Sequence, residues 1–197
     1  MPGDIAILGA GSWGTALAVH LARIGHAVRI WSIEAPVIAE MRERRANTVY
    51  LPDVALPDAV APTTAIEEAL GGIDVVVAVV PSHAMRGVAR AARPFLAPGA
   101  TLVSAAKGLE LDTLERMSQV LSQESGGKHP VVAMSGPSFA VEVARELPTA
   151  LAVASTDSSA AERVQAEFRG RFLRLYATSD VVGVEIGGAL KNVIAIA

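Results

Sequence analysis

The sequence predicts an α/β fold built on a doubly wound, mostly parallel sheet, and three observations support this. Short apolar runs typical of strands alternate with segments of helical spacing from the N-terminus onward. The connections between these segments are short, as in units where a helix joins two parallel strands. The run DVVVAVV at 74–80 is apolar on both faces, as expected of a strand that helices cover on each side.

The first half of the chain begins with a strand, a helix and a second strand. The run DIAILG leads into SWGTALAVHLARIG, whose apolar residues recur at helical spacing until a glycine ends the pattern. Farther on, Thr64 and Glu67 match a capping box, which predicts a short helix that ends at Leu70. The expected segments in order are a strand at 4–9, a helix at 12–25, a strand at 26–31, a helix at about 36–45, a proline-rich loop at 47–64, a helix at 64–70 and a strand at 74–80.

The second half continues the alternation and then changes character. From about Asp180 one apolar helix runs to VIAIA, which has neither a capping residue nor a polar tail. Such an ending predicts that the chain is a piece of a longer protein. The expected segments before it are a helix at 82–93, a strand at 100–105, a helix at 112–125, strands at 130–135 and 149–155, a helix at 157–169 and a strand at 172–177.

Composition and charge limit the classes of function. The 197 residues suffice for one domain and part of a second. A net charge of −3 provides no general basic field, which argues against nucleic acid as a partner. Without cysteine the chain has no disulfide and no thiolate metal site, so no metal is expected, and this fits a reducing cytoplasm. No apolar run approaches the roughly 18 residues of a membrane span, so we expect a cytoplasmic protein.

The strongest local motif is a glycine loop between the first strand and the first helix. Gly9, Gly11 and Gly14 form the pattern G-x-G-x-x-G in this context. Gly9 would allow a tight turn, Gly11 the close approach of a pyrophosphate, and Gly14 close packing of helix on strand. The alternative is a plain strand–helix turn that happens to be rich in glycine. The placement favours a dinucleotide-binding, Rossmann-type domain.

Ribose selectivity depends on the end of the second strand. Glu34 lies there, where a carboxylate could bind the adenosine ribose and repel a 2′-phosphate. Ile33 is apolar, but Arg42, Arg44 and Arg45 follow on the next expected helix. An equally open alternative is that Glu34 is a solvated residue at the start of that helix. The pattern favours NAD over NADP.

Three further strands end in distinctive loops. These are VPSH at 80–83, AAKGLE with Lys107, and SGPSFAVEVARELPTA from Ser135. They fall at the carboxyl edge of the sheet, where open α/β folds bind ligands. Taken singly, Pro81 can simply start a helix, His83 is typical of a surface or capping residue, and Lys107 can be a solvated loop charge.

A lysine in the last expected helix has apolar neighbours. Lys191 follows GGAL, and an ammonium in apolar surroundings loses hydration, which is costly unless the charge is paired or neutralised. The alternative is a lysine whose long side chain reaches solvent from an apolar helix. Its apolar neighbours in the sequence are Ile186, Leu190, Val193 and Ile194.

Together these motifs resemble one family, NAD(P)-dependent glycerol-3-phosphate dehydrogenase, particularly its bacterial branch. The resemblance runs through ILGAGSWGTALA, YLPDVALP, VPSH, AAKGLE, SGPSFAVEVARELPTA and GGALKNVIAIA, and so covers essentially the whole chain. It implies a Rossmann-type domain over 1–179 and, over 180–197, the first helix of an all-helical second domain. Many bacterial members carry His or Arg where this chain has Ile33, which argues against a strong preference for NADP.

The resemblance also implies an activity and assigns roles to residues. The reaction would be reversible hydride transfer between NAD(P)(H) and dihydroxyacetone phosphate, giving sn-glycerol 3-phosphate for phospholipid synthesis. Lys191 would donate and accept the proton, and the nearby charge of Lys107 would favour its release. The longer enzyme could be a homodimer. The implied cofactor contacts beyond the glycines and Glu34 are Ser12, Trp13, Pro81, Lys107 and Ala140, and the implied substrate contacts are Lys107, Gly136, Ser138 and Lys191.

Two rival functions share part of this pattern. Another two-domain reductase, of the 6-phosphogluconate or ketopantoate type, would share the glycine loop but would not require SGPSFAVEVA. A non-catalytic dinucleotide-sensing domain would need the glycine loop but has no use for a desolvated Lys191.

Overall fold

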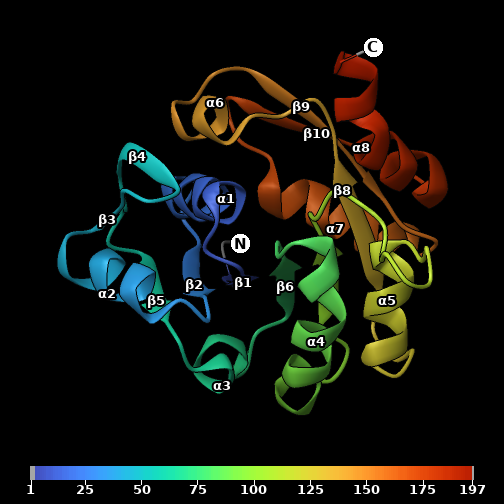
Figure 1. Cartoon of the computed structure of the whole chain (residues 1–197), viewed down its shortest axis with the longest axis horizontal. Helices are drawn as coiled ribbons and strands as arrows, with labels where there is room; N and C mark the ends of the chain where they lie inside the picture. The colour runs from blue at the N-terminus through green and yellow to red at the C-terminus, as the bar shows by residue number, and fades with distance from the viewer. Residues whose placement is uncertain (1–2, 197) are drawn as a thin grey trace.

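A computed structural model describes residues 3–196, with the backbone alone for 192–196. Within these residues an eight-stranded sheet has the order β10-β9-β8-β7-β6-β1-β2-β5 (Figure 1). Neighbouring strands are parallel except β8 and β9, which are antiparallel. The mostly parallel sheet is therefore confirmed. The strands are β1 Asp4–Leu8, β2 Ala27–Trp31, β5 Val60–Thr63, β6 Val75–Ala78, β7 Thr101–Ser104, β8 Val131–Ser135, β9 Thr149–Ala154 and β10 Leu173–Thr178.

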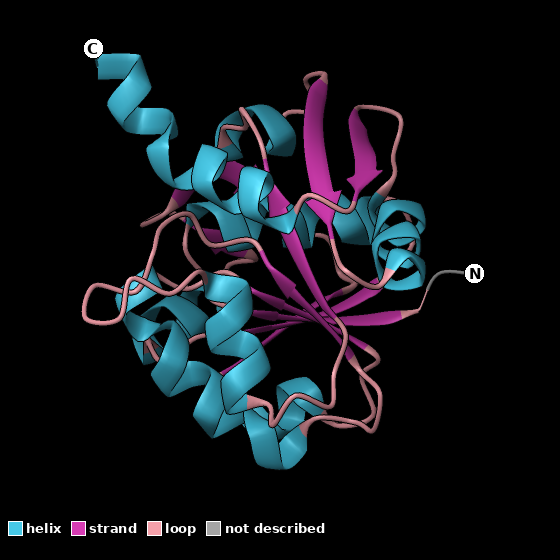
Figure 2. Ribbon diagram, turned by 90° about the vertical axis from the view of Figure 1, so that its right-hand side faces the viewer, coloured by secondary structure: helices cyan, strands magenta, loops and turns pink. Residues whose placement is uncertain are grey.

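Helices cover both faces of the sheet (Figure 2). Successive residues of β1 show why this is necessary: Ile5 and Ile7 are buried in one hydrophobic core, whereas Ala6 and Leu8 are buried in another. The first core is closed mainly by α1, α2, α6 and α7, and the second by α3, α4 and α5. The helices are α1 Ser12–Arg23, α2 Ala35–Glu43, α3 Ile66–Leu70, α4 Ser82–Ala92, α5 Met117–Glu124, α6 Ala140–Ala144, α7 Ser158–Phe168 and α8 Val181–Ile196.

The proline-rich segment expected as a loop is partly a set of strands, so this prediction was wrong. It contains β5 and a small antiparallel hairpin of β3 (Ala46–Asn47) and β4 (Leu51–Ala55). Proline argues against a strand because it has no N–H to donate to a ladder. Pro62 is tolerated because β5 pairs with β2 alone and forms the edge of the sheet.

The capping box expected at Thr64 and Glu67 is absent. Thr63, the last residue of β5, instead fixes the turn into α3: its hydroxyl accepts from the Ala65 amide at 3.0 Å and donates to Glu68 at 2.7 Å. The observed pair is five residues apart instead of three, because the start of α3 is set by where β5 ends. The short helix itself is confirmed.

The helix expected from residue 112 begins later because a hairpin precedes it. Leu109 and Arg116 form an isolated antiparallel bridge, and the amide of Glu110 donates to the carbonyl of Glu115 at 2.9 Å. Arg86 of α4 binds the carboxylates of both glutamates, at 2.7 and 2.8 Å. These contacts hold the segment after β7 in a defined conformation.

The route of α8 follows from the direction of β10. Register pairs Ala133 of β8 with Ala154 of β9, and Ala154 with Thr178 of β10. The end of β10 therefore lies at the amino edge of β8, and α8 must run back along β8 to reach the carboxyl edge (Figure 1). Asp180 caps its start by accepting from the Gly183 amide at 2.8 Å. Among the described residues no helix is long and apolar enough to cross a membrane.

Candidate active site

The glycine loop has the geometry that its sequence predicted. Gly9 has φ of 124°, and a Cβ there would lie 2.8 Å from the Val79 carbonyl oxygen. A Cβ at Gly14 would overlap the carbonyl oxygen of Gly9, so α1 can approach β1 only without one. A Cβ at Gly11 would meet nothing within 4 Å, and no side chain caps the start of α1. The loop therefore presents open backbone and uncapped amides, which suits a phosphate group.

Two buried polar residues that sequence reasoning missed brace this loop. Asn47 of β3 donates from Nδ2 to the Ala10 carbonyl at 2.9 Å and to Thr15 Oγ1 at 2.8 Å. Thr15 in turn donates to the same carbonyl at 3.3 Å. Both side chains are fully buried. Only the fold brings them together, because Asn47 lies in the segment that was expected to be a loop.

Glu34 lies beyond the end of β2, and it is exposed at the start of α2, as the solvated interpretation predicted. Its carboxylate does not cap the helix but accepts from the Tyr50 hydroxyl at 2.9 Å, which raises the pKa of Tyr50 above its ordinary value. Ile33 beside it is 83% exposed. The guanidiniums of Arg42 and Arg45 bind backbone carbonyls around β5, Arg42 at 2.8 Å from the Pro62 oxygen. The end of β2 is thus followed by a carboxylate, that of Glu34, which accepts a hydrogen bond from a tyrosine hydroxyl.

The loops after β6, β7 and β8 meet at the carboxyl edge, as expected. Pro81 begins α4, and His83 is exposed on that helix, as its surface interpretation predicted. Lys107 follows β7, and its Nζ lies 3.4 Å from the Gly136 carbonyl oxygen and 3.3 Å from Ser138 Oγ. The tertiary fold thus joins two loops that are separate in the sequence.

One aromatic ring and a second lysine lie near Lys107. Its Nζ lies 5.8 Å from the centroid of the Trp13 ring, which belongs to the glycine loop. Burial, and next the charge of Lys191, lower the pKa of Lys107 to about 8. Lys107 therefore stays mostly protonated at neutral pH but can release its proton in the mildly alkaline range.

Lys191 reaches this edge because α8 packs closely on β8. A Cβ at Gly188 would overlap Ser135 Oγ, so the helix can lie this near only with glycine there. The Lys191 Nζ lies 5.1 Å from the centroid of the Phe139 ring. Phe139 and Leu190 are themselves 62% and 47% exposed, so Lys191 is half-buried and is not enclosed by apolar side chains. Val193 and Ile194 belong to the residues whose side chains are not described.

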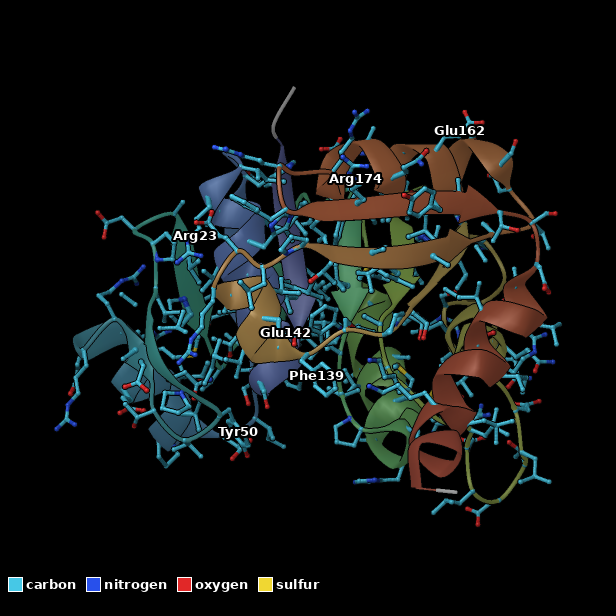
Figure 3. The ribbon with its side chains drawn as sticks, turned by 90° about the horizontal axis from the view of Figure 1, so that it is seen from above. Arg23, Tyr50, Phe139, Glu142, Glu162 and Arg174 are labelled. Carbon is cyan, nitrogen blue, oxygen red and sulfur yellow. The ribbon has the colours of Figure 1, made fainter. Side chains whose placement is uncertain are left out.

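A groove of about 670 Å³ runs between α8 and the ends of β8 and β9. Its floor includes Ser135, a buried hydroxyl without a hydrogen-bond partner among the described residues. Ala140 begins α6, which packs against α1, and Phe139 directly precedes it (Figure 3). Ser12 is exposed at the start of α1. The other lining residues that matter here are Gly136, Phe139, Gly187 and Lys191.

The described residues contain no group of three or more His, Cys, Asp or Glu side chains placed to hold a metal ion. The chemistry of the edge instead comes from two lysines, a hydroxyl and open backbone. Such a set can hold anionic groups and deliver a proton.

The fold and this edge define a doubly wound protein of the Rossmann type. The parallel strands lie in the order β5-β2-β1-β6-β7-β8. This is the order 3-2-1-4-5-6 of a doubly wound sheet when β5, β6, β7 and β8 are counted as the third to sixth strands. The glycine loop lies at the point where this order reverses. Residues 4–161 match a family described as NAD-dependent glycerol-3-phosphate dehydrogenase N-terminus. The chain belongs to this family.

Known relatives agree with the match. A glycerol-3-phosphate dehydrogenase, NAD(P)+ type, from Geobacter metallireducens is 52% identical, over 98% of this chain and 58% of the relative. One from Moorella thermoacetica is 49% identical, over 100% and 58%. The crystal structure of a glycerol-3-phosphate dehydrogenase from Coxiella burnetii superposes with a TM-score of 0.93 at 37% identity, over 99% of this chain and 59% of that one. The chain thus spans well under two thirds of its relatives.

Proposed function

We propose that the chain is the cofactor-binding part of an enzyme that interconverts dihydroxyacetone phosphate and sn-glycerol 3-phosphate with NAD(H) or NADP(H). The observation that carries this proposal is the meeting of Lys107, Gly136, Ser138 and Lys191 at one edge, beside the Trp13 of the glycine loop. The names of the relatives support the substrate and the cofactor. The product would supply phospholipid synthesis in the cytoplasm.

The glycine loop and the uncapped start of α1 fit the cofactor's pyrophosphate, because their amides are free and Gly11 leaves the approach open. Trp13, Pro81 and Ala140 lie on the three loops or helix starts that would flank it. When bound, the nicotinamide supplies or accepts the hydride. The carboxylate at Glu34 favours NAD(H), since it would repel a 2′-phosphate.

Lys191 and Lys107 have different roles in the proposed reaction. As the substrate carbonyl becomes an alcohol, negative charge develops on its oxygen, and Lys191 donates the proton that neutralises it; in the reverse direction Lys191 accepts that proton. Lys107, held by Gly136 and Ser138, supplies a fixed positive charge next to the anionic substrate. Burial and the charge of Lys191 lower the pKa of Lys107.

A domain boundary near residue 180 is part of the same proposal. Residues 1–179 would form the cofactor domain, and 180–197 the first helix of a helical substrate domain. On this view these 197 residues bind the cofactor, and closure over the substrate belongs to the part of the relatives that they do not span.

Turnover tests the proposal. The chain, completed with the C-terminal part of the Geobacter metallireducens relative, should oxidise NADH with dihydroxyacetone phosphate. Parallel assays with 6-phosphogluconate plus NAD(P)+ and with ketopantoate plus NAD(P)H address the rival reductases. Cofactor binding without turnover of any of these substrates would favour a sensing domain and contradict the proposal.

A further inference from the structure

Glu185 of α8 is a buried carboxylate that the chemistry above does not use. It is 8% exposed and accepts three hydrogen bonds from the start of α5. The donors are the Ser118 amide at 2.8 Å, the Ser118 hydroxyl at 2.6 Å and Arg116 Nη1 at 2.7 Å. A carboxylate buried in this way is costly unless it is fully paired, and this one is satisfied by a guanidinium and by the positive end of a helix.

The segment that Glu185 binds is the one that carries Lys107. Arg116 forms the antiparallel bridge with Leu109, and Leu109 follows Lys107 by two residues. Through this short hairpin, the position of Glu185 is linked to the position of Lys107. On the other side, Glu185 shares α8 with Lys191.

Within the described residues α8 meets β8 closely at Gly188, where a Cβ would overlap Ser135 Oγ. The side-chain hydrogen bonds that join this part of α8 to another element are those of Glu185. A directional, fully satisfied polar network specifies one arrangement, which backbone contact at a glycine does not. Glu185 provides that network.

We propose that Glu185 is a positioning residue that holds α8 against the Arg116 hairpin and thereby sets Lys191 beside Lys107. The proposal rests on the proposed function only for the importance of the lysine pair. The placement itself is a property of the chain and can be tested without turnover.

The direction in which the pKa of Lys107 moves when Glu185 is replaced distinguishes displacement of Lys191 from simple loss of the Glu185 charge. Removing the Glu185 carboxylate would by itself make the surroundings more positive and lower the pKa of Lys107. Moving Lys191 away would remove a like charge that lowers the pKa of Lys107, so that pKa would rise. The two effects have opposite signs.

The test uses Glu185→Gln in the 197-residue chain labelled with ¹³C-lysine. The chain's lysines are Lys107, Lys128 and Lys191, so the NMR signals are few, and exposed Lys128 serves as an internal reference. We expect the titration midpoint of Lys107 to rise by about half a pH unit or more while that of Lys128 stays constant. Glu185→Asp should restore part of the parental value.

Val164→Ala is the matched control, because it removes buried volume on α7 and leaves α5 and α8 untouched. It should lower stability without moving the Lys107 midpoint. A midpoint that falls or stays constant in folded Glu185→Gln overturns the proposal. If circular dichroism shows that variant to be unfolded, Ser118→Ala, which deletes one donor, should give a smaller rise, and no rise there overturns it. Neither result depends on whether the completed enzyme turns over its substrate.

Discussion

Replacing Gly188 by alanine should move α8 away from β8, and its neighbour Gly187 provides the matched control. Both glycines lie in the same turn of α8 and gain about 1 kcal/mol of intrinsic helix preference when replaced by alanine. A Cβ at Gly187 meets nothing within 4 Å, so Gly187→Ala should realise that gain. A Cβ at Gly188 overlaps Ser135 Oγ and lies 3.2 Å from Ser135 Cβ.

The size of the clash at Gly188 can be worked from these contacts. Rotation of the Ser135 side chain would relieve the overlap with Oγ, but the tight approach to Cβ would remain in a buried site. Overpacking of this kind costs about 1–3 kcal/mol, which offsets or exceeds the helix preference. Gly188→Ala should therefore be about 1–3 kcal/mol less stable than Gly187→Ala.

A double-mutant cycle isolates the contact. Ser135→Ala removes the Oγ atom, which has no hydrogen-bond partner among the described residues, so this change alone should be close to neutral or stabilising. In that background Gly188→Ala should cost clearly less, with a coupling free energy of about 1–2 kcal/mol. Urea unfolding of the 197-residue chain, followed by circular dichroism, measures all four variants. Equal stability of Gly187→Ala and Gly188→Ala would refute the close packing of α8 on Ser135.

The other predictions concern ligands. Gly11→Val should abolish NADH binding to the 197-residue chain, because a side chain there fills the approach of the pyrophosphate; calorimetry that shows unchanged affinity would mean the loop was misread. Replacing Ile33 with Arg and Glu34 with Ser should move preference toward NADP(H), and a parent chain that already prefers NADPH contradicts the role of Glu34. In the completed enzyme Lys191→Met should lower kcat by about a hundredfold or more with little change in NADH affinity, whereas a near-parental kcat would place the proton donor elsewhere. Because the pKa of Lys107 is about 8, its charge is present below that pH and lost above it. NADH binding should therefore weaken as pH rises past about 8, and the weakening should be absent in Lys107→Met.

Local patterns in the sequence were enough to predict the doubly wound sheet and the glycine loop. Apolar periodicity depends on neighbours a few residues apart, and the burial of Ile5 and Ile7 in one core and Ala6 in another reflects that pattern directly. The roles of Gly9 and Gly14 are likewise set by backbone geometry within one turn. These features require no knowledge of distant contacts.

The tertiary structure decided what distant contacts control. Pro62 became part of an edge strand because β2 offered a partner, and Thr63 binds the Ala65 amide before α3 because β5 ended there. The route of α8 depends on β9 and β10 running against β8, a direction that no local pattern in their apolar runs reveals. The meeting of Lys107 with Ser138, and the pKa of about 8 that follows from burial and the second lysine, exist only once those strands are placed. The physical reason is that periodicity records which face of an element is buried, whereas partners far apart in the chain are chosen by the packing of the whole fold.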